Sequence, residues 1–169
     1  CYRAAGISDD FLITCPGRST IAFNKLYATA SHGRPQQVAR FDRENTIPLP
    51  DDAEDKVIEA MERLAPELDA VLICDYEEVP GTAGASPRAL RRLLDLARQH
   101  GIVLAADSRM RIGALGPVDI AKPNDLEAAA AAGMADFGHR GDIPENVVLE
   151  AGRRLLDQAG IRHVVLTRG

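Results

Sequence analysis

Hydrophobic and polar positions alternate with period two between residues 18 and 44. The run TIAFNKLYAT is followed by QQVARFDRE across a connection that contains Gly33. Alternation of this kind, with glycine in the connection, predicts a β-hairpin. Both runs carry polar residues among apolar ones, as in a sheet half open to solvent or ligand. One face carries Ile21, Phe23 and Tyr27, which we expect to pack against a partner surface.

After residue 50 the pattern changes to apolar runs that alternate with helical periodicity. Residues 46–50 read TIPLP, and two prolines exclude a helix or central strand, so this segment is expected to be a linker. Beyond it, apolar runs predict strands at 70–74, 102–106, 118–121 and 163–167, while apolar residues at helical spacing predict helices before and between them.

Strands alternating with helices imply right-handed crossovers. They therefore predict an α/β fold with a Rossmann-like parallel sheet and helices on both faces. We expect two parts: residues 1–50, with the end of a preceding element and the β-hairpin, and residues 51–169, the α/β core.

Composition narrows the class of protein. The chain has 169 residues, 46% apolar and 27% charged, which is ordinary for one globular domain. A net charge of −5 argues against nucleic acid as a partner. No run approaches the ~20 apolar residues of a membrane span, there is no signal peptide, and three cysteines are too few for a disulfide framework or zinc site. These features predict a cytoplasmic protein with reduced thiols. The start at Cys1, not Met, favours a fragment or processed product.

Residues that could bind a ligand end or follow each predicted strand, namely Asp75, Asp107, Arg109, Lys122, Asn124, Thr167 and Gly169. Ligands of parallel α/β sheets bind at the carboxyl ends of the strands. Positive charge, hydroxyl and backbone N–H groups there could hold an anion. Asp75 and Asp107 would repel bare phosphate but could hold sugar hydroxyls or hydrated Mg²⁺. The alternative is that polar residues end most buried strands because loops are wet.

The junction KPNDLE places Asn124 and Glu127 on the first turn of a predicted helix. A capping box explains this spacing without any ligand. A strand-to-helix junction is also a place where α/β proteins bind phosphates. Neither nucleotide-binding fingerprint, the P-loop or Gly-x-Gly-x-x-Gly, is present. Glu77 and Glu78 are expected to be a solvated pair in a loop.

The order of these motifs resembles the ribokinase-like (PfkB) carbohydrate kinases. It is most similar to the sugar-phosphate kinase half of bacterial ADP-heptose synthase. The resemblance rests on the two hairpin runs, on AVLICDY, on IVLAADSR where the family has Asp-Pro-Lys, on KPNDLEA where it has Thr-Pro-Asn-x-x-Glu, and on HVVLTRG. It covers nearly the whole chain.

The resemblance implies ATP and Mg²⁺ as cofactors and a sugar or sugar phosphate as substrate. Asn124 and Glu127 would organise Mg²⁺ and the ATP phosphates. The other implied cofactor-binding residues are Arg109, Thr167 and Gly169, and the implied substrate contacts are Asp75, Asp107, Gln37 and Arg40. The hairpin would act as a lid over the sugar and could pair two subunits as a homodimer.

The chain departs from the family pattern in ways that leave a second reading open. Arg109 replaces the family lysine, which keeps the charge but changes its geometry, and Lys122 replaces the threonine. The Gly-Ala-Gly-Asp loop is absent, so the catalytic aspartate is expected beyond Gly169 and the fragment itself is expected to be inactive. The alternative is a non-catalytic binding or assembly module that kept the fold.

Overall fold

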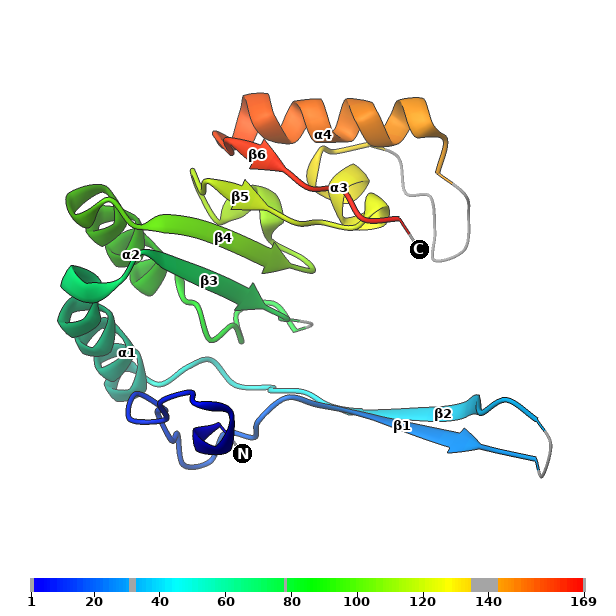
Figure 1. Cartoon of the computed structure of the whole chain (residues 1–169), viewed down its shortest axis with the longest axis horizontal. Coiled ribbons are helices and arrows are strands. Elements are labelled where there is room, and N and C mark those ends of the chain that lie inside the picture. Colours follow the sequence, from blue (N-terminus) through cyan, green and yellow to red (C-terminus); the bar gives the residue numbers. More distant parts are fainter. Residues whose placement is uncertain (1, 31–32, 78, 135–142, 169) are drawn as a thin grey trace.

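The computed structural model describes residues 2–30, 33–77, 79–134 and 143–168 (Figure 1). Its elements in chain order are η1 (Arg3–Ala5), β1 (Ala22–Ala28), β2 (Gln36–Arg43), α1 (Asp51–Leu64), η2 (Ala65–Glu67), β3 (Ala70–Asp75), α2 (Pro87–His100), β4 (Val103–Ser108), η3 (Ile112–Ala114), β5 (Ile120–Ala121), α3 (Asp125–Ala131), α4 (Glu145–Ala159) and β6 (His163–Val164). Within these ranges no helix combines the length and apolar character needed to cross a membrane.

The predicted hairpin is confirmed. Strands β1 and β2 pair antiparallel, with Phe23 opposite Asp42 and Lys25 opposite Arg40, and the register shifts between Leu26 and Tyr27. The hairpin is a separate two-stranded sheet, and it extends away from α1 in the general direction in which β3 and β4 point (Figure 1). The linker at 46–50 contains no strand or helix and leads directly into α1.

The predicted parallel sheet is also confirmed. Its four strands lie in the order β3-β4-β5-β6, and every neighbouring pair is parallel. Strands β5 and β6 are shorter than expected, and a bridge between Asn124 and Thr167 continues their pairing beyond the two strands. The carboxyl ends of all four strands therefore lie along one edge.

Helices cover only one face of this sheet among the described residues, so the prediction of helices on both faces needs correction. The covered face contributes Ile73, Leu104 and Ala121 to a core with Leu93 of α2 and Leu155 of α4. The other face is exposed, with Leu72, Val103 and Val165 among its residues. The physical reason is the strand order. When parallel strands follow one another in sequence order, right-handed crossovers place every helix on the same side.

A polar contact joins the first two helices. Glu54 of α1 is buried, and it accepts hydrogen bonds from the Ser86 hydroxyl and from Arg88 Nε at 2.5 Å. The Ser86 hydroxyl also caps α2 by accepting from the Ala89 backbone N–H at 3.0 Å. The hydrogen bond from Ser86 is the largest cause that holds the pKa of Glu54 below its ordinary value, with Arg88 adding to it against the opposing effect of burial.

We expect Glu54→Gln to flatten the acid dependence of stability. A carboxyl group whose folded-state pKa is lowered adds stability above its unfolded pKa, and this stability is lost as pH falls through the folded value. Urea unfolding at neutral pH and at several acid pH values measures the effect. Glu59→Gln, at an exposed position of the same helix, is the control. An acid profile for Glu54→Gln that matches the native chain would contradict the prediction.

Candidate functional site

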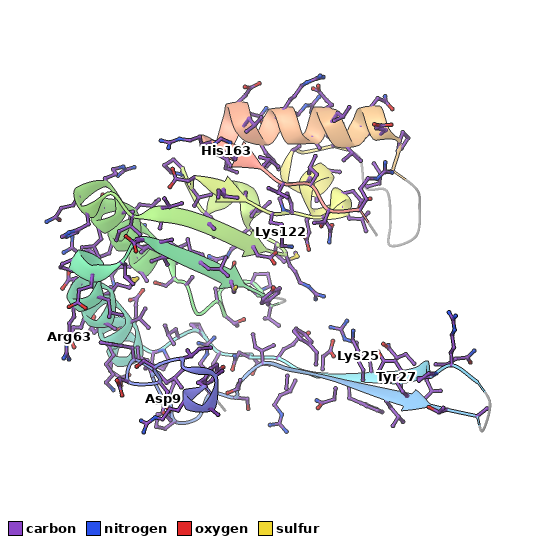
Figure 2. The ribbon with its side chains drawn as sticks, viewed as in Figure 1. Asp9, Lys25, Tyr27, Arg63, Lys122 and His163 are labelled. Atoms are coloured by element: carbon purple, nitrogen blue, oxygen red, sulfur yellow. The ribbon has the colours of Figure 1, made fainter. Side chains whose placement is uncertain are left out.

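Three side chains meet at the carboxyl ends of β3, β4 and β5 on the exposed face of the sheet. Asp107 Oδ2 accepts a hydrogen bond from the Tyr76 hydroxyl at 3.1 Å and lies 3.1 Å from Lys122 Nζ. Burial, followed by the hydrogen bond to Asp107, raises the pKa of Tyr76. The phenol therefore stays protonated at neutral pH and remains a hydrogen-bond donor. Figure 2 shows Lys122 where the chain leaves β5.

Asp75 lies on the opposite face of the sheet from Asp107. The strand register pairs Cys74 with Asp107 and Asp75 with Ser108, so the two carboxylates point to different sides. The Asp75 side chain is 2% exposed, and it accepts hydrogen bonds from Ser108 Oγ at 3.0 Å and Arg111 Nε at 2.9 Å. The predicted substrate contact does not fit this burial, and the position suits a structural role.

Asn124 and Glu127 form the capping box that their spacing predicts. Asn124 Oδ1 accepts from the Glu127 backbone N–H, and Glu127 Oε2 accepts from the Asn124 backbone N–H, both at 2.8 Å. Thr167 lies beside them, because its backbone N–H donates to Pro123 O at 3.1 Å and its carbonyl accepts from Asp125 N at 3.1 Å. The structure thus brings three of the predicted nucleotide-binding residues together. Gly169 lies outside the described residues.

The hairpin contacts the end of β4 through the ring of Phe23, which packs against Arg109. The Arg40 guanidinium lies 4.7 Å from the centroid of the Phe23 ring, and the Arg109 guanidinium lies 5.5 Å from it. Arg40 Nε also pairs with Asp42 Oδ1 at 2.8 Å. Cation–π contacts of this kind hold Arg109, at the end of β4, against the hairpin. Gln37 lies on β2 opposite Tyr27, further along the hairpin.

Among the described residues, the oxygen ligands gathered at the strand ends would make only a partial Mg²⁺ site. No group of three or more His, Cys, Asp or Glu side chains within the described ranges could hold a metal ion by itself. Magnesium usually takes one or two protein carboxylates and completes its shell with water and substrate phosphates. Glu127 fits such a partial site, since its capping hydrogen bond uses Oε2, and Asn124 supplies an amide oxygen beside it.

Two charged residues near the site were missed by sequence reasoning. Glu77 was expected to be solvated, but its side chain is 4% exposed and its Oε2 lies 2.8 Å from Arg111 Nε. Arg111 also donates from Nη2 to Ala85 O at 2.8 Å. Neither residue belongs to a local motif, and their pairing depends on the fold. Glu78 lies outside the described residues.

The architecture, a parallel α/β sheet with polar strand ends and a separate antiparallel hairpin, is the ribokinase-like α/β fold. Phosphofructokinase-2 from Escherichia coli, solved with potassium, aligns with a TM-score of 0.56 and 19% identity over 86% of this chain and 44% of that chain. The same enzyme solved with fructose-6-phosphate aligns with a TM-score of 0.53 and 19% identity over 86% of this chain and 45% of that chain.

Sequence comparison identifies the relatives more narrowly. The chain is 31% identical over 158 residues to the bifunctional protein HldE of Hyphomonas neptunium, which is 93% of this chain and 29% of that protein. It is 28% identical over 168 residues to HldE of Pelobacter propionicus, which is 99% of this chain and 31% of that protein. No family model matches. The chain is therefore homologous to one segment of the HldE proteins and spans less than a third of their length.

Proposed function

We propose that this chain is the central part of an ATP-dependent carbohydrate kinase that phosphorylates a sugar or sugar phosphate in the cytoplasm. The observation that carries the proposal is the Asn124–Glu127 box, which lies at the carboxyl end of β5 beside Thr167. An Asn-x-x-Glu pair in this place is what the resemblance to ribokinase-like kinases assigns to Mg²⁺ and the phosphates of ATP. Homology to HldE and the shared fold with phosphofructokinase-2 support the same class of reaction.

Each part of the candidate site has a place in this proposal. Glu127 and Asn124 would hold Mg²⁺, which supplies charge neutralisation at the transferring phosphoryl group when bound. Thr167 and Arg109 would face the phosphates. Asp107, which contacts Tyr76 and Lys122, would accept a hydrogen bond from a sugar hydroxyl.

The hairpin would cover the sugar through the face that carries Gln37 and Arg40. In the reaction, the sugar hydroxyl oxygen forms a bond to the γ-phosphorus, the bond from that phosphorus to the bridging oxygen of ADP breaks, and a carboxylate takes the hydroxyl proton. By the resemblance, that carboxylate would belong to a Gly-Ala-Gly-Asp loop, which these 169 residues do not contain.

The test compares this chain with a longer gene product that contains it. We expect the 169-residue chain to show no sugar-dependent ATP turnover, because loss of general-base assistance alone costs about 10²–10⁴ in rate. Incubation of both proteins with ATP, Mg²⁺ and a panel of sugars and sugar phosphates measures the difference. If the 169-residue chain turned over ATP near the rate of the longer protein, the catalytic base would have to lie within these 169 residues, and the proposed location would be wrong.

A second candidate is a non-catalytic binding or assembly module with the same fold. It is favoured by the contacts of two residues that depart from the family pattern: Lys122 pairs with Asp107, and Arg109 lies against Phe23. Both cations thus have protein partners. Absence of turnover by the longer protein with every sugar, together with absence of Mg²⁺–ATP binding by calorimetry, would favour this candidate.

We also propose a second copy of the chain as a partner through the hairpin. We predicted from the sequence that Ile21, Phe23 and Tyr27 pack against a partner, but Phe23 contacts residues of its own chain. We therefore propose the opposite face as the docking face, which carries Leu26, Ala39 and Phe41. Phe41 is 65% exposed there. An exposed apolar face on a two-stranded sheet favours burial against a like surface.

Phe41→Lys is expected to shift the chain from dimer to monomer, because it places charge in the centre of the apolar face. Sedimentation velocity at several concentrations measures the shift. Tyr27→Lys, at an exposed position on the other face of the hairpin, is the matched control and should leave the dimer intact. A native chain that sediments as a monomer at every concentration would contradict the proposal.

A further inference from the structure

A chain of buried and partly buried polar contacts runs from the strand ends to the base of the hairpin. Arg111, which follows β4, lies with its Nε 2.9 Å from Asp75 Oδ2 and 2.8 Å from Glu77 Oε2. Glu77 Oε1 accepts from the Thr82 backbone N–H at 3.2 Å. The Thr82 carbonyl in turn accepts from Arg18 Nη2. Strand β1 begins at Ala22, so Arg18 lies four residues before the hairpin.

The burial of these charges indicates a role in geometry. The side chains of Asp75 and Glu77 are 2% and 4% exposed, and that of Arg111 is 22% exposed. Buried ion pairs contribute little net stability compared with apolar residues, because removing charges from water is costly. The hydrogen bond of Arg111 to Asp75 is directional and does fix relative positions, while its contact with Glu77 is an ion pair. Here Arg111 also holds Ala85 O, so the loop between β3 and α2 is fastened to the end of β4.

We propose that Arg111 and Glu77 are positioning residues which, through Thr82 and Arg18, hold the hairpin at a fixed angle over the carboxyl ends of β3 and β4. The contact of Phe23 with Arg109 is the second point that defines this angle, since two points separated along the hairpin remove its freedom to swing. The spacing between the hairpin and the strand ends then depends on residues that would not touch the sugar. The proposal rests on the proposed function only in taking these strand ends as the substrate site.

The experiment measures the hairpin angle directly, without nucleotide or sugar. Spin labels are attached at Ala28→Cys on the hairpin and Gln99→Cys on α2, in the 169-residue chain with its three native cysteines replaced by serine. Double electron–electron resonance then gives the distribution of distances between hairpin and core. We expect a single narrow distribution, and its loss in Arg18→Ala and in Arg111→Lys. Lysine keeps the charge but cannot make both hydrogen bonds of Arg111 and its ion pair with Glu77 at once.

Comparison of the double variant with the two single variants distinguishes a positioning role from a general loosening of the structure. The double variant Arg18→Ala/Arg111→Lys is expected to be no broader than either single variant, because both break the same chain of contacts. Arg18→Lys, which keeps a donor for the Thr82 carbonyl, should restore the narrow component. Arg92→Ala, which removes a surface pair with Glu62, is the control and should leave the distribution unchanged. Urea unfolding of each variant confirms that the core stays folded.

A narrow distribution that persists in Arg18→Ala, an already broad native distribution, or additive broadening in the double variant would each overturn the proposal. Should Arg111→Lys fail to fold, Arg18→Ala decides alone, since Arg18 lies outside the core. Because no substrate is present, these outcomes are independent of whether the parent protein is a kinase. If the parent protein proved not to be a kinase, the measured distances between hairpin and core would still test the positioning role.

Discussion

Glu127→Gln in the longer gene product is expected to lower sugar-dependent ATP turnover about 10–100-fold, the usual cost of disturbing the shell around a bound metal. The amide oxygen of glutamine can still accept from the Asn124 backbone N–H, so the cap on α3 is kept. What is removed is the negative charge that Mg²⁺ and its water shell would require. Steady-state kinetics over a Mg²⁺ titration measure both turnover and the Mg²⁺ concentration at half effect.

The control for this variant lies in the same helical turn. Asp125→Asn also removes a carboxylate from the first turn of α3, but Asp125 lies 3.9 Å from Arg168 and outside the capping box. Its turnover and Mg²⁺ dependence should stay near those of the native protein. If Glu127→Gln also leaves turnover, Mg²⁺ dependence and unfolding free energy unchanged, Asn124 and Glu127 serve only as a helix cap.

Arg111→Ala is expected to lower the free energy of unfolding by about 3–5 kcal/mol, because it leaves two buried carboxylates without their cation. Both Asp75 and Glu77 lie within 2.9 Å of Arg111 Nε. Urea denaturation of the 169-residue chain measures the change.

Arg92→Ala is the matched control for this stability measurement. It breaks an exposed pair with Glu62 and should cost no more than about 1 kcal/mol. A loss for Arg111→Ala as small as the loss for Arg92→Ala would mean that water or rearrangement compensates the two carboxylates.

Local patterns predicted local structure well. The alternation before residue 45 specified the hairpin, and the spacing of Asn124 and Glu127 specified a capping box, since both features depend on residues close in sequence. The four apolar runs specified the parallel strands. Boundaries were less accurate for β5 and β6, whose pairing is short and continues as an isolated bridge.

The arrangement of the site depended on register and strand order, which a single sequence does not state. Asp75 and Asp107 both end apolar runs, so they were grouped, but a register offset of one residue places them on opposite faces. An apolar run such as AVLIC is typical of a strand buried on both sides, yet sequential strand order leaves one side without a helix. Glu77 and Arg111 pair across two strands, and no spacing rule connects them.

The exposed face of the parallel sheet affects how this chain behaves in a dye-based melting assay. Leu72 is 65% exposed on that face, and Val103 of β4 and Val165, directly after β6, are exposed there too. Fluorescent dyes such as ANS report accessible apolar surface and are commonly used to detect partly unfolded states. A fully folded chain would already give a high signal, so the increase on heating would be small. Thermal unfolding of this chain is therefore better followed by circular dichroism than by dye fluorescence.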